Sequence, residues 1–384
     1  MNSAGLQRPV LAVVGTRPEA IKMAPVLRAL DAADLPRRLC VTGQHRQMLD
    51  PILALWDLEA DHDLGVMEPA QGLPDLTARL LTGLGRVLER ERPSSVLVQG
   101  DTTSAFAGAL AAFYAGIPVG HVEAGLRTGD LAKPFPEEAN RRMIDALSTW
   151  CFAPTEGSRR ALAGEGRVRG VHVTGNTVVD ALLDLRRRLG GLPLERHRGR
   201  LGGAWGAVAD GDTTVVLVTC HRRESFGPKL EGICRAVRRL AEARPSTAWV
   251  FPVHLNPAVR RPAGALLRGL DNLHLIEPLP YDLCVQLMMR ASLILTDSGG
   301  IQEEAPSLGT PVAVLRDVTE RPEGIDAGVA TLVGTEEEGI HREVGRLLDA
   351  PEALGRMVAA SNPYGDGLAA ERIVGIVAEA SGGG

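Results

Sequence analysis

Short apolar runs that alternate with longer helical segments constrain the fold of this chain more than any other feature. The runs are rich in Val, Leu and Ile, and the segments between them carry Ala, Leu and Arg at helical spacing. Repeated strand–helix alternation requires right-handed crossovers, and it therefore predicts parallel sheets. The predicted strands lie at 9–14, 38–41, 95–98, 118–122, 150–153, 171–173, 215–218, 248–253, 272–276, 292–295, 311–315 and 329–333. Two sets of six strands indicate an α/β protein with two doubly wound, Rossmann-like domains.

The segment 190–214 separates the two sets of strands. It is rich in Gly, Arg and Asp, as loops and surface segments are. A chain of 384 residues is also too long for one compact core. We expect an N-terminal domain at 1–177, joined by a C-terminal helix at 366–384, and a second domain at 178–365.

The composition excludes several classes of function. A net charge of -5 and 3% aromatic residues disfavour a nucleic-acid partner. No apolar run approaches the ~18 residues of a membrane span, so we expect no membrane insertion. The five cysteines are scattered, which fits a reduced, cytoplasmic protein better than a disulfide framework. The histidines lack zinc spacing, so no metal is predicted and each is interpreted first as a hydrogen-bonding imidazole.

Polar residues gather where the predicted strands end. Ligands of open α/β folds bind beyond the carboxyl ends of parallel strands, so these ends predict a cleft between the two domains. The polar ends are 15–19 with Lys22, 42–46, 99–103, 121–127, 220–224, 254–256, 297–304 and 316–323.

The stretch 297–304 (DSGGIQEE) is the most informative of these ends. Two glycines let the backbone turn sharply into a new helix, whose unpaired N–H groups suit a phosphate oxygen. Glu303 and Glu304 follow half a turn later and suit sugar hydroxyls. The stretch therefore predicts a nucleotide-sugar site, and the alternative is an ordinary strand-to-helix turn.

Charged residues at the other strand ends suit a nucleotide diphosphate and proton transfer. Arginine and lysine side chains pair with phosphates, and positioned carboxylates or imidazoles move protons. The cationic candidates are Arg17, Lys22, Arg222 and Arg223, and the acids are Asp101, Glu123, Glu137, Glu138, Glu303 and Glu304. For Glu137 and Glu138, i,i+4 ion pairs with Arg141 and Arg142 are the alternative.

The chain resembles the bacterial non-hydrolysing UDP-N-acetylglucosamine 2-epimerases, which have the two-domain GT-B fold. The resemblance extends over nearly the whole chain and rests on many motifs in one order. These are GTRPEAIKMAP (15–25), TGQHRQML (42–49), QGDTTSA (99–105), GHVEAGLRTGD (120–130), PFPEEANR (134–141), VTGNTVVDAL (173–182), CHRRESFG (220–227), VHLNP (253–257), TDSGGIQEEAPSLGTPV (296–312), TERPEG (319–324) and NPYGDG (362–367).

The resemblance implies interconversion of UDP-GlcNAc and UDP-ManNAc with no cofactor and no metal. UDP is eliminated to give 2-acetamidoglucal and then adds back. The resemblance implies closure of the domains and a homodimer. The implied catalytic residues are Asp101, Glu123, Glu137 and His221. The implied substrate-binding residues are Arg17, Lys22, Arg141, His254, Ser298, Gly299, Gly300, Glu304 and Arg321. An activator site implied for some members falls on Gln44, His45, Gln47 and Gln71, although position 70 is alanine where some relatives carry arginine.

Three other functions stay open at this point. Hydrolysing 2-epimerases carry similar acids, and a GT-B glycosyltransferase shares the fold. A nucleotide-sugar sensor would bind without turnover.

Overall fold

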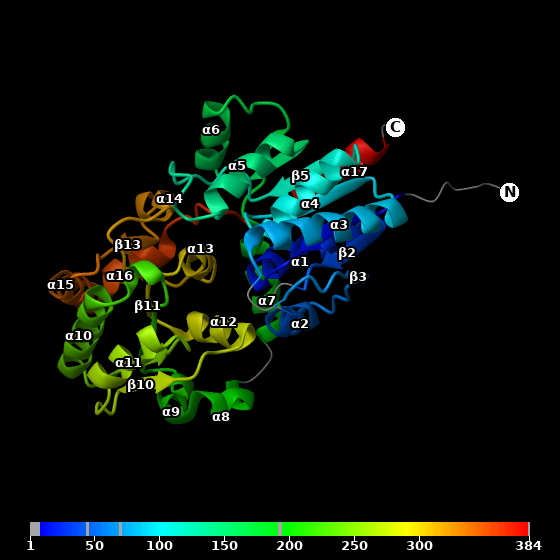
Figure 1. The fold of residues 1–384 in the computed structure, drawn as a ribbon. Helices are drawn as coiled ribbons and strands as arrows, with labels where there is room; N and C mark the ends of the chain where they lie inside the picture. Colours follow the sequence, from blue (N-terminus) through cyan, green and yellow to red (C-terminus); the bar gives the residue numbers. More distant parts are fainter. Residues whose placement is uncertain (1–7, 44–45, 69–70, 191–193, 383–384) are drawn as a thin grey trace. The chain divides into compact units, whose positions relative to one another are not determined.

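The computed structural model of the chain describes residues 8–43, 46–68, 71–190 and 194–382. The chain divides into two compact units (Figure 1). Unit 1 comprises Met1–Ala181 and Tyr364–Gly384, and unit 2 comprises Leu182–Pro363. Each unit is an α/β layer structure built on one parallel sheet, so the predicted fold class is confirmed.

The sheet of unit 1 has seven strands in the order β3-β2-β1-β4-β5-β6-β7. Neighbouring strands all pair in parallel. The strands are β1 (Val10–Val14), β2 (Arg37–Val41), β3 (His62–Asp63), β4 (Ser95–Gln99), β5 (Val119–Val122), β6 (Trp150–Ala153) and β7 (Val171–Val173). The sequence did not predict β3, because its two residues carry no apolar run.

Helices connect these strands, and α17 brings the C-terminal segment back to unit 1. The helices are α1 (Arg17–Ala32), α2 (Arg46–Leu55), α3 (Leu73–Glu91), α4 (Thr103–Tyr114), α5 (Glu137–Leu147), α6 (Glu156–Gly164), α7 (Thr177–Leu189) and α17 (Ala369–Gly382). The boundary between the units falls inside α7. The buried carboxylate of Asp180 accepts the backbone N–H of Ala370, and this bond ties α7 to α17.

The sheet of unit 2 has six parallel strands in the order β10-β9-β8-β11-β12-β13. The strands are β8 (Thr214–Thr219), β9 (Thr247–Pro252), β10 (Leu273–Ile276), β11 (Leu293–Thr296), β12 (Val312–Val314) and β13 (Ala330–Leu332). The α-helices are α8 (Arg198–Leu201), α9 (Trp205–Ala209), α10 (Pro228–Ala243), α11 (Pro257–Leu266), α12 (Tyr281–Arg290), α13 (Gly299–Ser307), α14 (Pro322–Asp326), α15 (Glu337–Leu348) and α16 (Pro351–Ala359). The 3-10 turns are η1 (Leu194–His197), η2 (Gly202–Ala204) and η3 (Arg223–Ser225).

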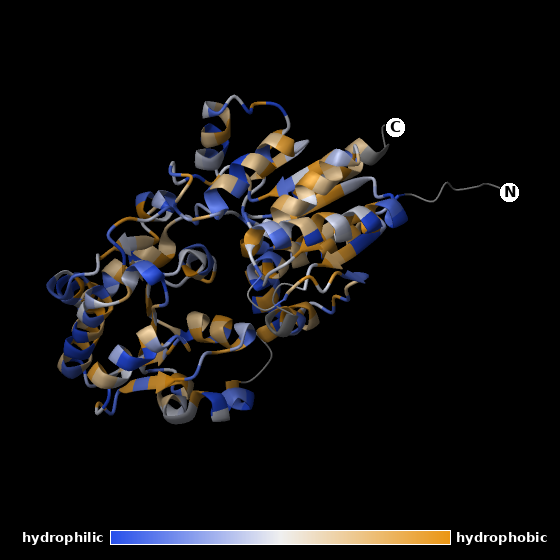
Figure 2. Cartoon of the chain, viewed as in Figure 1, coloured by the Kyte–Doolittle hydropathy of each residue, from blue (hydrophilic) through white to orange (hydrophobic). Residues whose placement is uncertain are grey.

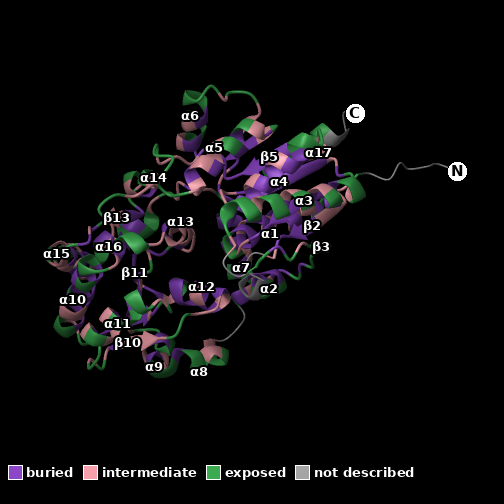
Figure 3. Cartoon of the chain, viewed as in Figure 1, coloured by how far each residue is buried: buried purple, intermediate pink, exposed green. Residues whose placement is uncertain are grey.

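The central strands of both sheets are buried on their two faces (Figure 3). All five residues of β1 and the central residues of β8 are inaccessible to solvent, as parallel strands between helices must be. Helix α4 is apolar over most of its surface (Figure 2), because it packs against β4 and against both α3 and α5. Within the described residues, no helix is both long and apolar enough to cross a membrane.

Candidate active site

Each sheet has one point at which the strand order reverses. In unit 1 this point lies between β1 and β4, and in unit 2 between β8 and β11. Loops diverge from neighbouring strands at such a switch point, so a ligand can approach the carboxyl ends there. The residues that follow these four strands, with others from neighbouring loops and helices, form the candidate site in each unit.

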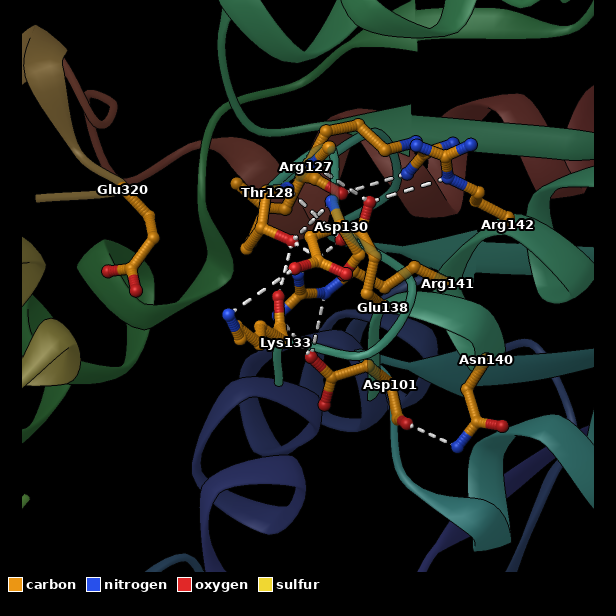
Figure 4. Close-up of polar contacts among 12 residues, drawn as sticks. Asp101, Arg127, Thr128, Asp130, Lys133, Glu138, Asn140, Arg141, Arg142 and Glu320 are labelled. Atoms are coloured by element: carbon orange, nitrogen blue, oxygen red, sulfur yellow. Dashed lines mark hydrogen bonds and ion pairs between the residues drawn. The ribbon is translucent and has the colours of Figure 1, made fainter. Parts of the chain in front are cut away.

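Asp101 follows β4 and is held by helix α5 (Figure 4). Both Nε and a terminal nitrogen of Arg141 lie 2.8 Å from its Oδ2. The side-chain amide of Asn140 donates to the Asp101 carbonyl at 2.8 Å. The Asp101 side chain keeps 26% of its surface exposed. A fixed carboxylate with a cationic partner and an open side is suited to proton transfer.

Glu137 and Glu138 begin α5 but have different surroundings. The fully buried carboxylate of Glu138 pairs with Arg141 at 2.9 Å and with Arg142 at 3.4 Å (Figure 4). It also accepts the N–H of Thr128 at 3.1 Å. The ion-pair alternative is therefore confirmed for Glu138.

The Oε2 atom of Glu137 is buried and has no hydrogen-bond partner among the residues that the structure describes. An orphaned buried carboxylate oxygen is costly and calls for a missing partner. The orphaned oxygen makes Glu137 a natural contact for a substrate proton or hydroxyl.

Glu123 follows β5 in the left-handed backbone region, with a φ of 70°. Its carboxylate forms an ion pair with Lys22 of α1 and accepts a hydrogen bond from the side chain of Gln99. Lys22, a predicted substrate-binding residue, is therefore paired with a predicted catalytic residue. The sequence assigned no role to Gln99, although its position at the end of a buried strand was a usable signal.

A buried hydrogen-bond network centred on His121 and Asp145 holds the loop that carries Asp101. The His121 ring contacts Asp145 at 2.6 Å through Nδ1 and the Gly100 carbonyl at 2.8 Å through Nε2. Arg127 lies 2.7 Å from the other side of the Asp145 carboxylate. Burial by itself would raise the pKa of Asp145, but His121 and Arg127 hold it below the usual range. His121 is thus a hydrogen-bonding imidazole, as predicted.

Asp297 organises the corresponding loops of unit 2. Its fully buried carboxylate accepts the N–H of His221 at 3.1 Å and that of Arg222 at 2.9 Å. The Cys220 thiol donates to it at 3.0 Å. Burial, together with Asp297, raises the pKa of this thiol well above its usual value, so Cys220 stays a protonated structural residue. Asp297 was missed as a site residue, although a charge directly after an apolar run marked it.

His221 remains accessible on this loop. Its side chain is 40% exposed, and its ring stacks on that of His254 with centroids 5.9 Å apart. The structure brings these two predicted site residues together.

Two guanidinium groups lie against Gly299, the first residue of α13. A methyl group added at Gly299 would lie 2.7 Å from the Arg321 guanidinium carbon and 3.0 Å from a terminal nitrogen of Arg222. Ser298 is the N-cap residue, and its side chain makes no capping hydrogen bond. The free N–H groups of the first helical turn and two cations suit a phosphate or diphosphate.

The paired acids at 303 and 304 divide between two roles. Glu303 is buried and accepts Nε of Arg321 at 2.7 Å, which fixes that guanidinium. Glu304 is less buried and accepts the Tyr281 hydroxyl at 3.4 Å. Only Glu304 presents a partly accessible carboxylate of the kind expected for a sugar.

The remaining predicted residues are less defined. Arg17 is the first residue of α1 and is exposed. Gln44, His45 and Ala70 lie outside the described residues, and so does the side chain of Gln47. Gln71 accepts the N–H of Glu68 at 3.3 Å.

No group of three or more His, Cys, Asp or Glu side chains within the described ranges could hold a metal ion.

The chain is similar over nearly its whole length to known UDP-N-acetylglucosamine 2-epimerases. The family model described as UDP-N-acetylglucosamine 2-epimerase matches residues 28–378. The chain is 51% identical to the UDP-N-acetylglucosamine 2-epimerase of Escherichia coli K12, over 95% of this chain and 97% of that protein. A crystal structure of the Neisseria meningitidis UDP-GlcNAc 2-epimerase bound to UDP-GlcNAc is similar, with a TM-score of 0.89 and 47% identity over 97% of this chain and 100% of that chain. A Methanocaldococcus jannaschii UDP-GlcNAc 2-epimerase in complex with UDP-GlcNAc and UDP matches with a TM-score of 0.79 and 33% identity, over 97% and 99% of the two chains.

Proposed function

Because the chain belongs to the UDP-N-acetylglucosamine 2-epimerase family, we propose that it interconverts UDP-GlcNAc and UDP-ManNAc without hydrolysis. A base removes the proton from carbon 2 of the sugar. The bond between carbon 1 and oxygen breaks, and UDP leaves with the electron pair to give 2-acetamidoglucal. UDP then adds back to carbon 1 while a proton returns to the opposite face of carbon 2.

Membership of the family over most of the chain carries the proposal, and a buried oxygen of Glu137 supports a role for that carboxylate. This buried oxygen has no hydrogen-bond partner among the described residues, whereas its neighbour Glu138 is fully paired. We assign proton handling at carbon 2 to Glu137 and Asp101 of unit 1, because Arg141 fixes the Asp101 carboxylate and the buried Glu137 oxygen is left to contact a ligand. Glu123, paired with Lys22, completes the proposed catalytic group there.

Unit 2 supplies the proposed nucleotide-binding groups. Ser298, Gly299 and Gly300 would cradle the diphosphate at the start of α13, beside Arg321. Glu304 would hold the ribose hydroxyls, and His221 would assist the departure of UDP. Stabilising the developing charge on UDP lowers the barrier of the elimination step, because that charge is greatest in the transition state.

The proposed substrate contacts also include Arg17, Lys22, Arg141 and His254. We further propose a homodimer in the cytoplasm, which requires no added cofactor. Gln44, His45, Gln47 and Gln71 are proposed to bind a second UDP-GlcNAc as an activator.

Proton NMR of the purified protein with UDP-GlcNAc in deuterium oxide tests the reaction directly. We expect UDP-ManNAc, with deuterium at carbon 2 of the sugar. Free ManNAc with UDP would show a hydrolysing enzyme instead. An unchanged sugar, with transfer only when an acceptor is added, would show a glycosyltransferase, and binding without turnover would show a sensor.

Two variants test the assigned carboxylates. Asp101→Asn and Glu137→Gln should each abolish epimerisation and leave UDP binding largely intact, because the proposed UDP groups belong to unit 2. Turnover close to that of the wild type in both variants would contradict the carboxylate mechanism.

A further inference from the structure

Glu19, in the first turn of α1, is a buried carboxylate to which the proposed mechanism assigns no role. It is 2% exposed. Its Oε2 accepts the backbone N–H of Gly15 at 3.0 Å and that of Thr16 at 2.5 Å. Its Oε1 accepts the Thr102 hydroxyl at 2.7 Å. All three groups donate to Glu19, and the Thr16 hydroxyl also hydrogen-bonds this carboxylate.

These bonds join the two loops of the unit 1 switch point. Gly15 and Thr16 follow β1 and precede Arg17, whereas Thr102 follows β4 and Asp101. Thr102 is also the N-cap of α4, where its hydroxyl accepts the N–H of Ala105 at 3.1 Å. One carboxylate therefore spans the loop of a proposed substrate residue and the loop of a proposed catalytic residue.

The two loops are closely packed around Gly15. A methyl group added at Gly15 would lie 2.6 Å from the Cβ atom of Ser104 and 2.9 Å from Oγ1 of Thr42. The hydroxyls of Ser104 and Thr42 are themselves 2.9 Å apart. A small shift of either loop therefore moves the other, because protein interiors are close-packed.

We infer that ionised Glu19 is a positioning residue that locks the Arg17 and Asp101 loops in their active arrangement, and that protonating it releases them. Hydrogen bonds to an ionised carboxylate are roughly twice as strong as bonds between neutral groups. Protonation therefore weakens the bonds from the backbone N–H groups of Gly15 and Thr16. It also turns the Thr102 hydroxyl from a donor to Glu19 into an acceptor, through the lone pair that Ala105 does not use. The inference rests on the proposed roles of Arg17 and Asp101.

The surroundings of Glu19 place this change near neutral pH. Burial raises the pKa of Glu19 to about 7, although the bonds from Thr102, Thr16 and Gly15 lower it. None of these donors is charged. The charged residues in the two loops are Arg17 and Asp101, and Lys22 on the same helix is paired with Glu123. Activity should therefore rise as the pH increases through about 7.

The test compares the pH dependence of kcat and KM for the wild type and Glu19→Gln. The wild-type kcat should carry a rise with an apparent pKa near that of Glu19, between about pH 6 and 8. Glu19→Gln should lose this rise. At about pH 8 its kcat should be ~10–100-fold below that of the wild type, because a slightly misplaced catalytic group slows the reaction by about that factor.

A second pair of variants identifies the titrating group without touching Glu19. Thr102→Ala removes one donor, so the rise in kcat should move to higher pH. Thr102→Ser keeps the hydroxyl and should leave the rise in place.

Two outcomes would overturn the inference. One is a Glu19→Gln variant slowed by the same factor at every pH, which indicates a purely structural role. The other is a rise of kcat with pH that occurs at the same pH in Thr102→Ala as in the wild type. Asp101→Asn and Glu137→Gln separate this failure from that of the proposed function, because full turnover in both variants would refute the mechanism itself.

Discussion

Gly299→Ala tests the diphosphate site by moving its cations without removing them. The added methyl carbon would lie 2.7 Å from the Arg321 guanidinium carbon, whereas carbon atoms in contact are about 3.5–4.0 Å apart. The guanidinium must therefore retreat by roughly 1 Å or more. Glu303 opposes this retreat, because its buried carboxylate holds Nε of Arg321 at 2.7 Å.

The effect should appear in UDP binding far more than in stability. A hydrogen bond to a charged group contributes about 1.5–3 kcal/mol, so losing one such contact weakens UDP binding by about 10- to 150-fold. The folded protein loses little, because a flexible side chain absorbs the strain and alanine favours a helix over glycine by up to about 1 kcal/mol. The Tm should stay within about 4 °C of the wild type.

Isothermal titration calorimetry with UDP and thermal unfolding measure the two quantities. Gly375→Ala is the matched control, because Gly375 also lies in a helix and an added methyl group meets nothing within 4 Å. We expect the control to bind UDP as the wild type does. An unchanged Kd for UDP in Gly299→Ala would refute the assignment of the diphosphate to the cations beside Gly299.

Three further predictions concern the groups that support the site. Asp297→Asn places an amide N–H₂ against the backbone donors that fix His221. The free energy of unfolding, measured in urea, should fall by ~1–3 kcal/mol, and kcat should fall by ~10–100-fold. An unaltered kcat would contradict a role for Asp297 in positioning His221. Arg127→Met removes a cation from the buried Asp145, so the free energy of unfolding should fall by about 3–5 kcal/mol. The double variant with Asp145→Asn should recover part of this stability. No recovery would show that the destabilisation has another cause. The raised pKa of Glu19 means that the folded protein binds a proton which the unfolded chain has released, so its contribution to the free energy of unfolding decreases by roughly 3 kcal/mol as the pH rises from 4.5 to about 7. The difference in stability between the wild type and Glu19→Gln, followed over that range, should show this decrease, and a difference that is constant with pH would exclude it.

The two parallel sheets could be predicted because their central strands are buried on both faces. Such strands need unbroken apolar runs, and each predicted run became a strand, whereas the two-residue β3 left no such trace. The order of motifs likewise identified the family, because that order is a property of the chain itself.

The pairing of the charged side chains was decided by the tertiary structure. Glu137 and Glu138 are equivalent by spacing, yet one is fully paired and the other keeps a buried oxygen without a described partner. Lys22 and Glu123 lie 101 positions apart and meet only because β1, β4 and β5 are neighbours in the sheet. Strand order therefore fixes which carboxylates meet a cation, a backbone N–H or nothing. The sequence determines which charges stand at the strand ends, and the fold determines which of them remain to act on a ligand.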